Sequence, residues 1–290
     1  MNILVTGANG FIGRRLSSRL MAQDHQVFGL FLKSPSKPSL GFKQYFQHDI
    51  TKPFSIKYPF DLVIHLAAYN ITNVGAKDAD QYKAVNVEGT KHLLQGVDAK
   101  RLIYLSTAKV YKNEGLGLIE DSPVFPLGAY EQSKLKAEEI CQTFFKKKTL
   151  VILRSVNVIG GGQAPKAVIP VFFQKAKAGQ PLDIMNGGEV PMQFVYVEDL
   201  VDAFEAVIKH ESIEGIYNIA YEGTVSLKQL ARKIIKLTHS SSSLNISKST
   251  SKILFSPVVC NKAYKQLGWK ARTGLNRVLE LYWEENAKNP

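Results

Sequence analysis

The chain has 290 residues, the length of one large domain or two modest ones. Hydrophobic residues make up 45% and charged residues 21%, as in globular proteins, which excludes wholesale disorder. No apolar run approaches the ~18–20 residues that a membrane span needs, and no basic segment precedes the apolar N-terminus as in a signal peptide. The two cysteines, Cys141 and Cys260, cannot form a disulfide framework and lack metal-ligand spacing with the six histidines. We therefore expect a cytoplasmic protein without a metal site.

The net charge of +12 favours anionic partners, such as nucleic acid, a membrane surface or a phosphorylated small molecule. The basic residues are scattered along the chain. The densest run, 146–148, falls between a helical and a strand pattern, and cations suit the C-terminal end of a helix. Because no motif that reads DNA or RNA accompanies the charge, we expect a small-molecule ligand and no nucleic acid.

The first half of the chain alternates short apolar runs with longer amphipathic stretches. This alternation predicts parallel strands with helices on both faces, an α/β doubly wound fold. The predicted strands are Asn2–Thr6, Gln26–Phe31, Gln44–Gln47, Asp61–His65, Arg101–Ser106 and Leu150–Arg154.

The texture of the sequence changes near residue 160, where three glycines open a loop. We predict helices over 169–178, 199–208 and 226–237, the last with Ser226 as N-cap, and a strand over 216–219. The Ser/Lys-rich segment 239–252 is expected to be a mobile surface loop. The domains are predicted as 1–160, joined by parts of 190–220, and a smaller mixed α/β lobe over 161–290 that binds substrate at the cleft.

A glycine-rich turn follows the first predicted strand and opens the first predicted helix. Gly7 permits the tight turn, Gly10 lets the backbone approach a pyrophosphate, and Gly13 allows the helix to pack closely on the strand. N–H groups at the start of a helix bind phosphate, so the turn predicts a dinucleotide site rather than an unliganded turn. The turn also contains Asn9, Phe11 and Ile12.

A tyrosine and a lysine, Tyr130 and Lys134, lie four residues apart in a helical pattern and so share one helix face. A free tyrosine is a poor base at neutral pH, with a pKa near ~10, and a neighbouring cation lowers that pKa. An isolated pair of this kind is usually an exposed tyrosine beside a solvated lysine. The glycine turn upstream favours a catalytic pair instead.

The ordered motifs together resemble the extended short-chain dehydrogenase/reductases, the family of NAD(P)-dependent nucleotide-sugar epimerases and dehydratases. The resemblance covers nearly the whole chain and implies a Rossmann-type sheet with a smaller C-terminal lobe. It rests on the Gly-x-x-Gly-x-x-Gly turn, Asp49-Ile50, His65-Leu66-Ala67-Ala68, Asn86-Val87-Glu88-Gly89-Thr90, Leu105-Ser106-Thr107, Tyr130-x-x-x-Lys134, Leu153–Val158, Phe194–Asp199, Tyr217-Asn218-Ile219 and Leu267-Gly268-Trp269.

The resemblance implies further cofactor-binding residues. Asp49 would accept a hydrogen bond from the adenine amino group, with Ile50 beside the ring, although turn propensities alone make Asp49 an equally good turn residue. The small residues of the Leu66-Ala67-Ala68 turn would let backbone approach the ribose and pyrophosphate, and Asn86 would also contact the cofactor.

The same resemblance implies a catalytic set of Thr107, Tyr130 and Lys134. Thr107 would hydrogen-bond the reacting oxygen, Tyr130 would exchange a proton with the substrate hydroxyl, and Lys134 would lower the pKa of Tyr130 and bind the nicotinamide ribose. Asn157 stands where the family contacts substrate. We expect two neighbouring residues to be structural: His65 as a hydrogen-bonded core histidine and Cys141 as a packing residue.

Several activities fit this set. An epimerase and a ketoreductase need only the hydroxyl residue, tyrosine and lysine, and nothing in the residues separates the two. Family dehydratases carry an acidic pair after the hydroxyl residue, where this chain has Ala108 and Lys109, so a 4,6-dehydratase is the weaker alternative. A non-catalytic cofactor-binding regulatory protein is weaker still, because the whole catalytic set is present.

The second predicted strand bears on the choice of cofactor. Proteins that prefer NAD place an acid near its end, at about Phe31 here, and no Asp or Glu occurs between Asp24 and Asp49. Lys33, with Ser34, Ser36 and Lys37 after it, suits a 2′-phosphate unless the stretch is only a solvated loop. We therefore predict NADP or NAD as cofactor, with NADP slightly preferred.

The predicted substrate is a sugar or nucleotide sugar, but one departure concerns its diphosphate. The family's phosphate-binding Arg-Asp is replaced by Met192 and Gln193, and no later arginine falls within 239–259. Ordinary nucleotide sugars are therefore expected to bind weakly. A homodimer is expected from the resemblance, through helices at about 79–99 and 130–146.

Overall fold

The computed structural model describes residues 1–33, 41–71, 78–248 and 255–287, which form two compact units. The first unit contains residues 1–112, 120–155 and 204–218. The second contains residues 113–119, 156–203 and 219–290. The chain therefore leaves the first unit after Ser155 and returns to it at Phe204.

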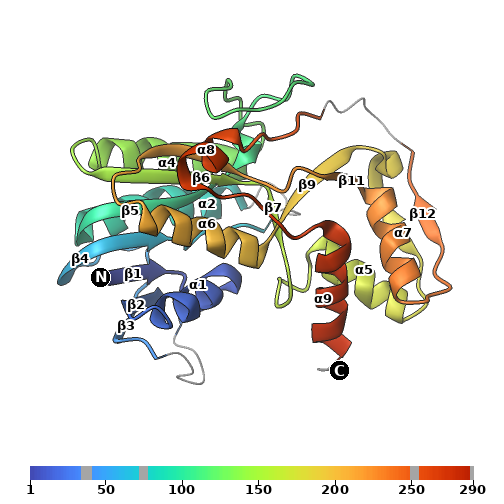
Figure 1. Cartoon of the computed structure of the whole chain (residues 1–290), viewed down its shortest axis with the longest axis horizontal. Helices are drawn as coiled ribbons and strands as arrows, with labels where there is room; N and C mark the ends of the chain where they lie inside the picture. The colour runs from blue at the N-terminus through green and yellow to red at the C-terminus, as the bar shows by residue number, and fades with distance from the viewer. Residues whose placement is uncertain (34–40, 72–77, 249–254, 288–290) are drawn as a thin grey trace. The chain divides into compact units, whose positions relative to one another are not determined.

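The first unit is built on a seven-stranded sheet in the order β10-β6-β5-β4-β1-β2-β3 (Figure 1). Its strands are β1 (Asn2–Thr6), β2 (Gln26–Phe31), β3 (Gln44–Gln47), β4 (Ile56–His65), β5 (Val97–Thr107), β6 (Thr149–Ser155) and β10 (Gly215–Ile219). The pairs from β3 to β6 are all parallel. The order β3-β2-β1-β4-β5-β6 is that of a dinucleotide-binding sheet, and it confirms the predicted doubly wound fold.

The strand order reverses between β1 and β4, where Thr6 lies opposite His65. In such sheets ligands bind outside the carboxyl ends of the strands at this switch point. The segments that follow β1 and β4 are the glycine turn and Leu66-Ala67-Ala68. The topology thus brings together two turns that lie about sixty residues apart in the chain.

The helical elements of the first unit include one unusual segment. They are α1 (Phe11–Met21), α2 (Ala79–Tyr82), the π-helix Lys83–Glu88, α3 (Gly89–Gly96), the 3₁₀ turn Ala108–Val110, α4 (Ala129–Phe144) and part of α6 (Val197–Lys209). The helix expected over 79–99 ends at Gly96. A Cβ at this position would lie 1.9 Å from the carbonyl oxygen of Phe54, so only glycine fits this close approach. β5 begins at the next residue.

Both faces of the sheet are buried, as the continuous apolar strands predicted. On one face Leu4, Val63 and Tyr104 pack with Leu93 of α3 and Ala137 of α4. The intervening strand residues, among them Ile3, Val5, Ile64 and Ile103, are also buried. This packing fixes α4, which carries the tyrosine–lysine pair, against β5.

The second unit combines two small sheets with helices (Figure 1). One sheet has the order β11-β9-β7 and the other pairs β12 with β8. The elements are β7 (Asn157–Ile159), α5 (Val168–Lys177), β8 (Leu182–Ile184), the 3₁₀ segment Met185–Gly188, β9 (Pro191–Tyr196), part of α6, β11 (Thr224–Ser226), α7 (Leu227–Leu237), β12 (Leu244–Ile246), α8 (Asn261–Leu267) and α9 (Leu275–Ala287).

Two predictions for this unit have different outcomes. Ser226 is the N-cap of α7: its hydroxyl accepts from the N–H of Gln229, whose side chain accepts from the N–H of Ser226 in return. The expectation of a loop throughout 239–252 is wrong, because β12 forms a parallel pair with β8. Leu244 packs against the apolar core beside Leu182, which a Ser/Lys-rich composition does not reveal.

Candidate active site

The glycine turn has the geometry that its spacing predicts. Gly7 has a φ of +64°, and a Cβ at this position would lie 3.0 Å from the amide nitrogen of Ala67. A Cβ on Gly13 would lie 2.2 Å from the carbonyl oxygen of Gly7. Each glycine therefore permits an approach that a side chain would block.

The N-terminal end of α1 suits an anionic ligand. Its N-cap is Gly10, no side chain caps the free N–H groups, and the first turn contains no acid. Unsatisfied N–H groups and the positive end of the helix dipole together attract phosphate. These residues fit the pyrophosphate of a dinucleotide, and Asn9, Phe11 and Ile12 lie in the same turn.

The turn after β4 is held against β1 by a threonine. Thr6 Oγ1 accepts hydrogen bonds from the N–H groups of Leu66 and Ala67, both at 3.1 Å. His65 lies beside it as a buried and fully hydrogen-bonded core histidine, as predicted, and Thr6 was not singled out from the sequence. The Leu66-Ala67-Ala68 turn is thus in place beside the glycine turn.

The two residues expected at the adenine have local partners. Asp49 Oδ1 accepts from both the N–H and the hydroxyl of Thr51, and these hydrogen bonds lower the pKa of Asp49. Ile50 is 7% exposed and packs against Gly89, where a Cβ would lie 2.9 Å from its Cδ1. Asp49 has the turn role that its position allows, and the adenine contact stays a prediction.

Of the residues expected near the cofactor ribose, Phe31 is buried and Lys33 is exposed. Phe31 is buried among Phe42 and Tyr45, and Asn9 Nδ2 donates to the carbonyl of Lys33 at 3.1 Å. The exposed Lys33 thus belongs to the glycine-turn region. Ser34, Ser36 and Lys37 lie outside the described residues.

Asn86 has a structural role that the sequence did not reveal. Its amide nitrogen donates to the carbonyl of Tyr69 at 3.0 Å and to Ser133 Oγ at 2.9 Å, while its Oδ1 accepts from the N–H of Tyr69 at 2.8 Å. Both amide hydrogens are therefore committed within the protein. Asn86 lies in the π-helix, a rare segment that often marks functional sites.

The predicted catalytic hydroxyls meet at the carboxyl end of β5. Thr107 is the last residue of β5, Tyr130 is the second residue of α4, and the side chain of Thr107 lies close enough to the phenol of Tyr130 to lower the pKa of that phenol. Burial, reinforced by Glu131 and Tyr82, raises the pKa of Tyr130, and the nearby side chain of Thr107 offsets only part of this increase. Tyr130 is therefore a protonated phenol at neutral pH.

Lys134 is buried but does not have the expected effect. Its ammonium donates to the carbonyl of Leu105 at 2.7 Å and lies 4.2 Å from the centre of the Tyr104 ring. Burial lowers the pKa of Lys134 to about 8, although Glu138 and Cys141 act in the opposite direction. The expectation that Lys134 lowers the pKa of Tyr130 is not met in this structure: burial of the phenol raises that pKa, and Thr107 is the residue that lowers it.

Met192 and Gln193, which replace the family's phosphate-binding Arg-Asp, both lie in the second unit. Met192 in β9 pairs with Val225 and packs on the apolar core. Gln193 is 4% exposed and bonds to backbone atoms of Tyr221 and Val258. Both side chains thus serve packing within the unit, while Asn157 in β7 is exposed.

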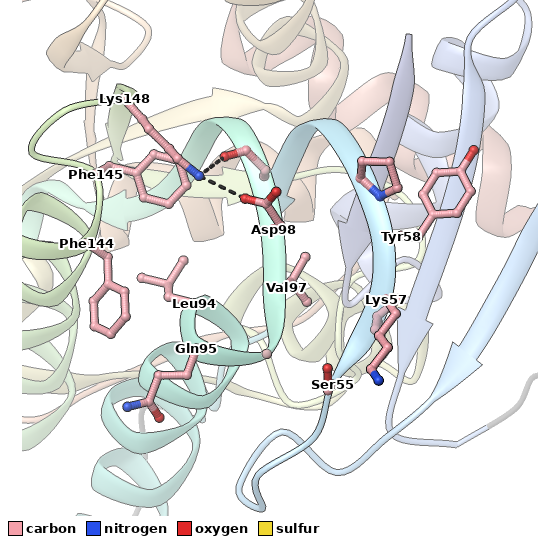
Figure 2. Close-up of a pocket in the computed structure, with 14 residues that line it drawn as sticks. Ser55, Lys57, Tyr58, Leu94, Gln95, Val97, Asp98, Phe144, Phe145 and Lys148 are labelled. Atoms are coloured by element: carbon pink, nitrogen blue, oxygen red, sulfur yellow. Dashed lines mark hydrogen bonds and ion pairs between the residues drawn. The ribbon is translucent and has the colours of Figure 1, made fainter.

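The first unit also has a hollow of about 580 Å³ that does not belong to this candidate site. It lies at the amino ends of β4 and β5, where Lys148 donates to Asp98 at 2.9 Å and to the carbonyl of Ala99 at 2.8 Å (Figure 2). One member of the basic run 146–148 is therefore an anchor for β5. The residues predicted to be catalytic and to bind the cofactor lie at the opposite ends of these strands.

Among the helices that the structure describes, none has the length and apolarity of a membrane span.

Residues 3–220 match the model of the NAD dependent epimerase/dehydratase family. The dTDP-D-glucose 4,6-dehydratase of Dictyostelium discoideum is 29% identical over 81% of this chain, and the match spans 62% of the length of that protein. The dTDP-D-glucose 4,6-dehydratase of Mus musculus is 30% identical over 97% of this chain and 88% of its own length. UDP-glucuronic acid 4-epimerase from Bacillus cereus, solved with UDP-glucuronic acid and NAD, is 25% identical over 99% of both chains, with a TM-score of 0.88. The chain belongs to the NAD-dependent epimerase/dehydratase family, the extended short-chain dehydrogenase/reductases.

Proposed function

We propose that the protein is an epimerase or ketoreductase of a sugar or nucleotide sugar, with Thr107, Tyr130 and Lys134 as its catalytic residues. The observation that carries the proposal is the proximity of the side chain of Thr107 to the phenol of Tyr130, whose pKa it lowers. Both groups lie at the carboxyl end of β5, the edge of the sheet that also carries the Gly7 turn. Two hydroxyls at one point can hold a carbonyl or an alcohol oxygen.

The raised pKa of Tyr130 indicates how the reaction proceeds. A protonated phenol donates its proton to a carbonyl oxygen while the carbonyl carbon receives a hydride, which yields an alcohol and a tyrosinate. The nicotinamide, when bound, supplies or accepts the hydride. In the reverse direction the tyrosinate takes the proton of the alcohol. Thr107 keeps the oxygen within reach in both directions.

Lys134 has donors beyond the one it uses within the protein. An ammonium has three N–H donors, and one reaches the carbonyl of Leu105. The others suit the hydroxyls of the nicotinamide ribose. The positive charge of Lys134 would also favour the tyrosinate that forms in this step.

Dehydration remains the alternative because two of the relatives are named dehydratases. A dehydratase must protonate and expel a hydroxyl of its substrate, which a carboxylic acid performs well. The two positions after Thr107 carry a buried Ala108 and an exposed Lys109. The absence of a carboxyl group at these positions favours epimerisation or reduction.

We propose NAD as the working cofactor, with NADP as the alternative. The family description and the Bacillus cereus relative both name NAD. The preference for NADP drawn from Lys33 receives no support from these relatives. Equilibrium titration with NADH and NADPH tests the choice directly, and tighter binding of NADPH would restore the preference for NADP.

Retention of cofactor separates the two leading activities. An epimerase returns the hydride to the opposite face of its substrate, so stoichiometric cofactor should survive desalting of the purified enzyme. A ketoreductase should consume added reduced cofactor with a sugar ketone. Incubation with nucleotide sugars followed by chromatography should reveal epimers in the first case, and a 4-keto-6-deoxy product would establish dehydration instead. A homodimer stays a prediction, which the mass in solution tests.

A further inference from the structure

A buried chain of hydrogen bonds begins at the two turns that are expected to bind the cofactor. Thr6 Oγ1 accepts from the N–H groups of Leu66 and Ala67 and lies 2.7 Å from Nδ1 of His65. Nε2 of His65 lies 2.9 Å from the hydroxyl of Thr90, which donates to the carbonyl of Asn86 at 2.7 Å. The four residues that these hydrogen bonds connect, Thr6, His65, Thr90 and Asn86, are each at most 1% exposed.

The donors and acceptors fix the position of every proton. Two N–H groups occupy the lone pairs of Thr6 Oγ1, so its own hydrogen must point to Nδ1 of His65, which is then an unprotonated acceptor. The proton of the neutral imidazole therefore lies on Nε2 and is donated to Thr90, whose hydrogen already serves Asn86. A proton on Nδ1 would face the hydrogen of Thr6.

The chain of bonds continues to the catalytic helix. The side chain of Asn86 donates to Ser133 Oγ at 2.9 Å, and Ser133 donates to the carbonyl of Tyr130 at 2.7 Å. Its other end lies between the glycine turn and the turn after β4, where a Cβ on Gly7 would lie only 3.0 Å from the amide nitrogen of Ala67. One side chain, His65, connects the two halves of this arrangement.

We propose that His65 is a positioning residue whose neutral Nε2–H tautomer orients the hydroxyl of Thr6 and thereby holds the two cofactor-binding turns at their working distance. A histidine that merely fills space would need no particular tautomer. This inference rests on the proposed function only in that the two turns bind a dinucleotide. It does not depend on which sugar the enzyme converts.

The two amide substitutions of His65 distinguish positioning from packing. His65→Asn places an acceptor near the position of Nδ1 and keeps the partner of Thr6, whereas His65→Gln places its polar atoms near Nε2 and leaves Thr6 without its acceptor. Thr6→Ser and Thr6→Val form the matching pair on the other side of the bond. We expect His65→Asn and Thr6→Ser to bind NADH close to the wild-type affinity.

His65→Gln and Thr6→Val should weaken NADH binding by about tenfold or more. His65→Gln leaves the hydroxyl of Thr6 without its acceptor, and Thr6→Val removes the acceptor of the buried N–H groups of Leu66 and Ala67. The midpoint of thermal unfolding is measured for each variant. The proposal would be overturned if His65→Asn lost as much NADH affinity as His65→Gln and if these losses simply followed the loss of thermal stability in each variant.

Nitrogen NMR of the His65 ring in the intact protein reads the tautomer without any cofactor. The expected spectrum has a protonated Nε2 and an unprotonated Nδ1, and a proton on Nδ1 would overturn the assignment. A wild-type protein that binds neither NADH nor NADPH would overturn the proposed function together with this inference. Normal binding without turnover of any sugar would overturn the proposed activity alone.

Discussion

Arg154 holds both carboxylate oxygens of Glu138, with Nη2 at 2.7 Å from Oε2 and Nε at 3.1 Å from Oε1. The side chains are 5% and 2% exposed. Ser106, the residue before Thr107, donates to the same carboxylate. This ion pair therefore joins α4, β6 and the end of β5 directly beside the proposed catalytic residues, and it was not identified from the sequence.

Substitution of Glu138 by Gln should be strongly destabilising. It leaves the buried guanidinium of Arg154 without a counter-charge, which typically costs about 3–5 kcal/mol in the free energy of unfolding. Glu139→Gln on the same helix is the matched control, because Glu139 forms an exposed pair with Lys136 that should contribute little. Urea unfolding measures both variants, and equal losses would contradict the role assigned to the buried pair.

Removal of the hydroxyl of Tyr104 should not destabilise the protein. This side chain is 1% exposed, and its hydroxyl oxygen has no hydrogen-bond partner among the described residues. Tyr104→Phe keeps the ring beneath the ammonium of Lys134 while removing an unsatisfied polar group, whose burial costs about 1–3 kcal/mol. We expect an unchanged or higher midpoint of thermal unfolding. A clearly lower midpoint would mean that the hydroxyl has a partner in solution.

Acid should destabilise the folded state through His65. Burial, together with the charge of Lys134, lowers the pKa of His65 to about 3, whereas a histidine in the unfolded chain has a pKa of about 6.5. The unfolded state therefore binds the proton first, and stability is lost as the pH falls from 6.5 towards 3, by about 1.4 kcal/mol per unit. Above pH 7 His65 contributes no pH dependence, because it is neutral in both states.

Urea unfolding of the wild-type protein and His65→Asn between pH 7 and pH 4 measures this contribution. The stability of the variant should depend less steeply on pH below 6.5, since Asn does not titrate. Identical slopes would show that His65 takes up a proton in the folded protein.

Tyr130→Phe should abolish turnover and leave NADH affinity nearly intact. The ring keeps its packing against Tyr82, with ring centres 5.8 Å apart in the wild-type structure, and only the proton-exchanging hydroxyl is lost. Steady-state kinetics and cofactor titration together provide the test. Undiminished turnover would exclude Tyr130 as the acid and base.

Ordinary nucleotide sugars should bind weakly. The packing of Met192 on the apolar core leaves that position without the planar cation that grips a diphosphate. Calorimetry with uridine, thymidine and guanosine diphosphate sugars, in the presence of NADH, measures the affinities. Low-micromolar binding of any of them would show that another group replaces the missing arginine.

Local sequence patterns were sufficient to predict the order of the secondary-structure elements, the glycine turn and one helix cap. Short apolar runs that alternate with amphipathic stretches are typical of a parallel sheet covered by helices, and they predicted the order of the elements in the first half of the chain. The bounds of three predicted strands, β1, β2 and β3, agree with the structure to the residue. The Gly7–Gly13 spacing and the Ser226 cap are equally local, because each depends on backbone geometry within a few residues.

Tertiary structure alone decided the properties that depend on contacts distant in sequence. The raised pKa of Tyr130 comes from burial, whereas the i, i+4 spacing to Lys134 predicted the opposite. The tautomer of His65 depends on Thr6, 59 residues away, and on Thr90, 25 residues away. Desolvation and the direction of a hydrogen bond are set by whatever the fold brings to a group, and a single stretch of sequence does not contain that information.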